Sequence, residues 1–173
     1  MPVAPLAVAS LMVLVTIVIQ IAGLTLLILL MRSRLDHERA HRYVINQLGL
    51  VLGVALGLFL IHTIQIWLYA LVFMWVGAFD TFEPALYFST SSFTTVGYGD
   101  IVLETDWRLL GAIESANGFL VLGWSTVFLI SVISRLRSIE FQWLERREAE
   151  ADLFEAQQAR DDADEDPGRN GDA

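Results

Sequence analysis

The sequence contains no cysteine and no lysine, and all eleven of its basic residues are arginine. Without cysteine the chain forms no disulfide bond. The sequence also has no catalytic triad, no phosphate-binding glycine loop and no cluster of metal ligands. We therefore expect no enzyme activity and no cofactor.

Charged residues are scarce as well, at 18% of the chain, whereas hydrophobic residues make up 55%. A soluble domain has about 45–50% apolar and about 25% charged residues. Three apolar segments, 3–31, 48–78 and 109–134, are long enough to span a bilayer as helices, which takes about 20 residues each. The first has no basic residue before it and is longer than the apolar core of a signal peptide, so we expect it to be retained.

Arginines cluster between the first two apolar segments and directly after the third. These residues are Arg32, Arg34, Arg39, Arg42, Arg135 and Arg137. By the positive-inside rule both clusters face the cytoplasm, whereas the acidic segment 79–108 lies outside. We expect a multi-pass protein of the cell (inner) membrane with its N-terminus outside and its C-terminus in the cytoplasm.

No apolar segment carries arginine at every third position, which excludes a voltage sensor of the usual kind. After Arg137 only 36 residues follow, too few for a separate ligand-binding domain. Residues 140–173 contain twelve acidic residues and four arginines, which gives −8 of the net charge of −9. The acidity therefore belongs to the C-terminal tail and does not indicate nucleic-acid binding.

A distinctive hexapeptide, Thr95–Asp100 with the sequence TVGYGD, stands between the second and third apolar segments. Gly97 and Gly99 can adopt positive φ values at no steric cost. A backbone that alternates between ordinary and left-handed conformations turns successive carbonyl groups the same way. Before the hexapeptide, the sequence Glu83-Pro84 is typical of a helix start and predicts a short helix from Pro84 to Thr94. Its length of about 16 Å is half the thickness of a membrane.

The run from about Leu48 to Arg137 resembles the pore domain of tetrameric potassium channels, most closely the small bacterial channels of the two-helix ion-transport class. In that family four loops form a selectivity filter in which backbone carbonyls replace the water around the ion. The resemblance implies that K⁺ is the permeant ion. It also implies that the ion is coordinated by Thr95, Val96, Gly97 and Tyr98. The outer filter turn is then formed by Gly99 and Asp100.

Other residues are expected to support the filter. Tyr87 and Phe88 stand where many family members have two tryptophans, so the aromatic support behind the filter is altered. Ser91 stands where some bacterial channels have a glutamate that pairs with the filter aspartate, so that carboxylate pair is absent. Glu114 on the third apolar segment lies level with the short helix, and we expect it to hydrogen-bond to Ser91, Ser92 or backbone.

The third apolar segment contains the candidate hinge and cavity residues. Gly118 falls where the family often has a hinge glycine, and close helix packing is the alternative role for this residue. Leu122, Thr126, Ile130 and Ser134 follow at steps of four residues and are candidates for the cavity lining and inner gate.

The second apolar segment carries His62, which is expected to contact Gln20 or Gln65, or alternatively to sense pH. Three glycines recur along this segment at every fourth residue and predict close packing of another helix. They are Gly49, Gly53 and Gly57.

These observations predict an all-α membrane protein with three transmembrane helices, a re-entrant pore helix and a selectivity filter, assembled as a tetrameric channel. The expected parts are an N-terminal transmembrane helix (1–31), a basic cytoplasmic linker (32–47), the pore module (48–137), a cytoplasmic helix (138–159) and a disordered acidic tail (160–173).

The sequence therefore favours a potassium-selective channel, a homotetramer in the lipid bilayer. Three alternatives stay open. A subunit of a potassium uptake transporter is disfavoured, because such systems resemble four fused modules with degenerate filters. The others are a non-conducting membrane protein with a relict pore and a hetero-tetramer with a larger relative.

Overall fold

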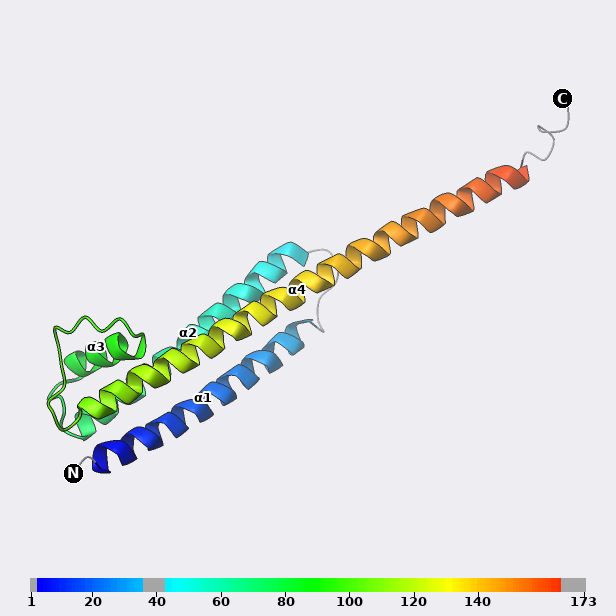
Figure 1. The fold of residues 1–173 in the computed structure, drawn as a ribbon. Coiled ribbons are helices and arrows are strands. Elements are labelled where there is room, and N and C mark those ends of the chain that lie inside the picture. Colours follow the sequence, from blue (N-terminus) through cyan, green and yellow to red (C-terminus); the bar gives the residue numbers. More distant parts are fainter. Residues whose placement is uncertain (1–2, 36–42, 166–173) are drawn as a thin grey trace. The chain divides into compact units, whose positions relative to one another are not determined.

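The computed structural model describes residues 3–35 and 43–165, and these residues form helices and loops without any strand (Figure 1). The helices are α1 (Val3–Leu35), α2 (Tyr43–Trp75), α3 (Phe82–Phe93) and α4 (Arg108–Glu165). Three stretches are long and apolar enough to cross a membrane: Val3–Arg32, Gly49–Trp75 and Arg108–Arg135. The all-helical class and the three predicted spans are thus confirmed, and the chain is a multi-pass membrane protein.

Helix α3 is the short helix predicted before the hexapeptide. It has 12 residues, with Glu83 and Pro84 in its first turn and Thr94 at its C-cap. A helix of this length extends about 18 Å, which is too short to cross a bilayer. The acid and the proline favour the first turn because the N–H groups there have no partner within the helix.

The chain divides into two compact units, residues 1–130 and 131–173. In the second unit α4 continues to Glu165, so the expected disorder from residue 160 is wrong for residues 160–165. No glycine or proline interrupts residues 131–165. The remaining tail lies outside the described residues.

The segment expected as a basic linker, 32–47, includes helical residues at both of its ends. Helix α1 continues to Leu35 and α2 begins at Tyr43, while residues 36–42 lie outside the described residues. Charged and polar residues with good helix propensity extend a helix beyond its apolar span, which hydropathy alone does not reveal.

Glycines allow α1 and α2 to approach closely. A Cβ atom on Gly23 would lie 2.5 Å from Cδ1 of Ile61, and one on Gly57 would collide with the side chain of Leu27. Of the three glycines predicted to accept another helix, Gly57 does so in this chain and its partner is α1. A Cβ on Gly49 or Gly53 would meet nothing within 4 Å.

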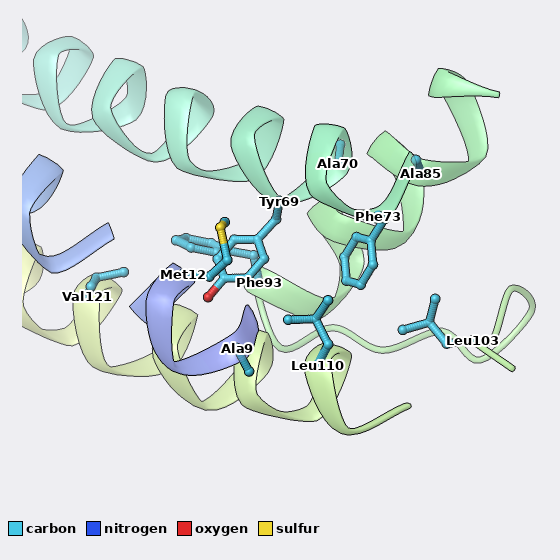
Figure 2. Packing of buried hydrophobic residues seen from close by; sticks show 10 residues of the cluster. All are labelled: Ala9, Met12, Tyr69, Ala70, Phe73, Ala85, Phe93, Leu103, Leu110 and Val121. Carbon is cyan, nitrogen blue, oxygen red and sulfur yellow. The ribbon is translucent and has the colours of Figure 1, made fainter. Parts of the chain in front are cut away.

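An apolar core packs α3 against the longer helices, and Figure 2 shows its side chains converging from all four helices and the loop before α4. Its members are Ala9, Met12, Tyr69, Ala70, Phe73, Ala85, Phe93, Leu103, Leu110 and Val121. Phe73 stacks edge-on against Phe88 of α3, with ring centroids 5.3 Å apart. Such aromatic pairs stabilise a core beyond the area that they bury.

Candidate functional site

The TVGYGD loop (Thr95–Asp100) follows α3 and folds back along its last turns. The N–H of Gly97 donates to the carbonyl of Ser91 at 3.1 Å. The N–H of Tyr98 donates to the Ser91 hydroxyl at 3.3 Å. Ser91, expected only as a departure from the family pattern, therefore binds the middle of the loop through both its backbone and its side chain.

The backbone of the loop alternates in conformation. Thr95, Gly97 and Gly99 have φ values of 61°, 57° and 78°, whereas Val96 and Tyr98 between them are not in the positive region. The predicted alternation is present, and both glycines occupy left-handed positions. Thr95 was not expected there, because a β-branched residue at positive φ is strained by about 1–3 kcal/mol.

Asp100 at the end of the loop is bound to α3. The Tyr87 hydroxyl donates to Oδ2 of Asp100 at 2.8 Å. This hydrogen bond favours the charged carboxylate, so it lowers the pKa of Asp100 and raises the pKa of Tyr87. The sequence predicts Tyr87 only as part of the aromatic support, and no sequence signal identifies its hydroxyl as the partner of Asp100.

Ser89 of α3 lies between Glu114 of α4 and the backbone of α2. Oε1 of Glu114 lies 2.5 Å from the hydroxyl of Ser89, which also lies 2.9 Å from the carbonyl of Ile66. The Glu114 side chain is fully buried, and its Oε2 has no hydrogen-bond partner among the described residues. The expected partners Ser91 and Ser92 are wrong, because Ser91 faces the loop whereas Ser89 faces α2 and α4.

Gly118 is the point at which α4 contacts the end of α3. A Cβ atom there would lie 2.8 Å from the carbonyl carbon of Phe93, 2.9 Å from its Cα and closer still to its carbonyl oxygen. Phe93 is the last residue of α3, two positions before the loop. The structure thus gives Gly118 a close packing contact, and the hinge role stays a prediction.

The row of four candidate cavity residues after Gly118 is not buried uniformly. Leu122 is half-buried and Thr126 and Ile130 are exposed, as is Ser134 in the second unit. A row with four-residue steps advances about 40° beyond a full turn at each step, so it winds around the helix. The row therefore passes from the packed side of α4 to its exposed side, and its role in a cavity stays a prediction.

His62 lies close to Gln65, with Nδ1 3.4 Å from Oε1 of that residue. Its Nε2 is buried and has no hydrogen-bond partner among the described residues. Gln20, the other expected partner, instead contacts Gln65 and Ser125. Of the two predicted contacts, the one with Gln65 is present.

The outer face of the TVGYGD loop is uncovered in a single chain. Every residue of the loop is exposed, with 53% of Val96 and 74% of Tyr98 accessible. Irregular backbone at membrane depth is tolerated only where it is covered by protein or lines a water-filled cavity. The described residues of one chain provide only the inner cover, from α3.

Comparison with known proteins finds one segment of the chain that matches a protein family. Residues 57–135 match the model of a family described as "Ion channel". The matched residues include most of α2, the whole of α3, the TVGYGD loop and the membrane-spanning part of α4. No curated protein and no solved structure matches the chain.

Proposed function

Because residues 57–135 match the model of the ion channel family, we propose that the chain forms a potassium-selective channel. Four copies surround one pore, and K⁺ moves passively down its electrochemical gradient. The observation that carries this proposal is the alternation of backbone conformation at Thr95, Gly97 and Gly99.

The alternation supplies the chemistry that a dehydrated cation requires. When every second residue is left-handed, successive carbonyl groups turn toward the same side of the loop. Four loops then present rings of oxygen atoms from Thr95, Val96, Gly97 and Tyr98, with the Thr95 hydroxyl as a further ring. Such rings replace the hydration shell of K⁺.

Assembly follows from the exposed loop. Three further copies cover its outer face and enclose the axis that a single chain leaves open. In this arrangement α3 is re-entrant, and the partial negative charge at its C-terminal end faces the ion cavity. Leu122, Thr126, Ile130 and Ser134 of four copies line the pathway below the filter.

The outer mouth is acidic, which fits cation entry from outside the cell. Asp80, Glu83, Glu104 and Asp106 are all exposed on or near the loops flanking α3. A cluster of one sign of charge raises the local concentration of counter-ions. Arg32 and Arg34 at the end of α1, and Arg135 and Arg137 at the end of the membrane-spanning part of α4, face the cytoplasm in this orientation.

The test is the reversal potential of the purified protein in a planar bilayer with K⁺ on one side and Na⁺ on the other. A potassium-selective channel reverses at a large potential that is negative on the K⁺ side. A reversal potential near zero, with current carried equally by both ions, contradicts the proposal and indicates a non-selective pore.

A further inference from the structure

Six buried polar side chains lie where α1, α2 and α4 meet, and we call them the three-helix polar cluster. They are Thr16 and Gln20 of α1, Gln65 and Tyr69 of α2, and Asn117 and Ser125 of α4. None is more than 5% exposed. In a membrane, buried polar groups are costly unless they are hydrogen-bonded to one another.

Two short hydrogen bonds join α1 to α4. The Asn117 amide donates to Oγ1 of Thr16 at 2.7 Å, and the Gln20 amide donates to Oγ of Ser125 at 2.7 Å. Two helical turns separate Asn117 from Ser125 on α4, so the bonds fix α4 at two levels. Both the rotation and the height of α4 relative to α1 are therefore specified.

Helix α2 completes the cluster. The Gln65 amide donates to Oε1 of Gln20 at 3.1 Å and to the carbonyl of Thr16 at 3.2 Å. Asn117 also donates to the Tyr69 hydroxyl at 3.2 Å. Each α1 side chain in the cluster thus contacts α4 while α2 contacts the same part of α1.

On α4, the three-helix polar cluster lies next to the residue that contacts the end of α3. Asn117 immediately precedes Gly118, which packs against the backbone of Phe93 at the end of α3. A shift or rotation of α4 at Asn117 changes this backbone contact. Because no Cβ separates the two backbones, the change is passed to the residues that lead into Thr95.

We propose that α1 contributes to the function of the pore module. In this proposal Thr16 and Gln20 are positioning residues that keep Gly118 packed against Phe93. The effect on conduction rests on the potassium-channel function proposed above. Helix α1 lies outside the matched residues 57–135, so the family assigns it no role.

The first experiment measures docking without any flux. A double-mutant cycle of Thr16→Val and Asn117→Leu is measured by equilibrium unfolding of the full chain in mixed micelles. We expect the two substitutions to be coupled by about threefold in the unfolding constant, the average for a hydrogen bond between membrane helices. If the two substitutions act independently, the unfolding constant of the double mutant changes by the product of the two single effects. That result overturns the proposal.

The second experiment measures potassium flux through assembled protein in liposomes. Thr16→Val is expected to change the flux by about threefold or more. The reason is that the equilibrium constant for packing α1 against α4 falls by a similar factor. Thr16→Ser keeps the acceptor for Asn117 and restores the flux. Thr25→Val is the matched control, since the Thr25 hydroxyl donates only to Ile21 of its own helix at 2.8 Å and is exposed.

The outcomes separate this inference from the proposed function. Coupling together with an altered, serine-rescued flux supports a positioning role. Coupling with unchanged flux in assembled Thr16→Val overturns it and leaves a purely structural contact. If the parent protein passes no potassium, the channel proposal fails, and the unfolding cycle still decides whether α1 is docked on α4.

Discussion

Gly118→Ala tests the contact between α4 and the end of α3. The added Cβ would lie 2.8 Å from the carbonyl carbon of Phe93, which must move by 0.6 Å to reach the 3.4 Å of ordinary contact. The carbonyl oxygen is closer still, and all of these atoms belong to backbone. No side-chain rotation relieves the overlap, so α3 and α4 have to separate.

The packing and hinge roles of Gly118 predict changes of opposite sign in the free energy of unfolding of Gly118→Ala. Overpacking in a core costs about 1–3 kcal/mol. Replacing glycine by alanine in a helix contributes about 1 kcal/mol of stability. Because the overlap involves backbone on both sides, we expect the upper part of the packing range and a net loss of about 1–2 kcal/mol. A glycine that serves only as a hinge gives a gain of about 1 kcal/mol instead.

The assay is the free energy of unfolding in mixed micelles, combined with potassium flux in liposomes. Gly123→Ala on the same helix is the matched control, because its Cβ would meet nothing within 4 Å. We expect the control to be as stable as the parent or more stable, and Gly118→Ala to be less stable with reduced flux. Equal or higher stability of Gly118→Ala refutes the packing argument.

Substitutions at two further residues test the support behind the loop. Glu114→Gln keeps an oxygen that accepts from the Ser89 hydroxyl and should unfold like the parent. Glu114→Leu should lose about 0.6–1.7 kcal/mol in the same unfolding assay. Equal stability of the two variants contradicts a role for the hydrogen bond. The lowered pKa of Asp100 means that its contact with Tyr87 stabilises the loop above the ordinary aspartate pKa of about 3.9, and that this stabilisation is lost as the pH falls through the lowered value. Tyr87→Phe should remove this part of the acid dependence of the free energy of unfolding, and an acid profile identical to that of the parent refutes the assignment.

The three spans and α3 were predictable because each depends on a local signal. Apolar length identifies a span, and Glu83-Pro84 marks the start of a helix. The end of α4 at Glu165 was not predictable in this way, since an acidic segment rich in helix-forming residues fits either a helix or a disordered tail.

The partners of polar side chains were the least predictable part of the site. Depth in the membrane places Glu114 level with α3, but only the rotation of both helices decides that Ser89 faces it and Ser91 does not. The left-handed conformation of Thr95 also had no sequence signal, because the propensity of threonine argues against it. The packing of α1 depends on similar long-range pairings, such as Gln20 with Ser125.

Potassium flux from liposomes that hold the purified protein, with sodium as the competing ion, tests the central claim most directly. Gly97 has a φ of 57°, where any other residue is strained, so Gly97→Ala is expected to abolish selective flux. Gly53→Ala, whose Cβ would meet nothing within 4 Å, should conduct like the parent. Potassium-selective flux that is lost only in Gly97→Ala is the predicted result. Equal passage of sodium and potassium, or selective flux that survives Gly97→Ala, contradicts the assignment of the TVGYGD loop as a potassium filter.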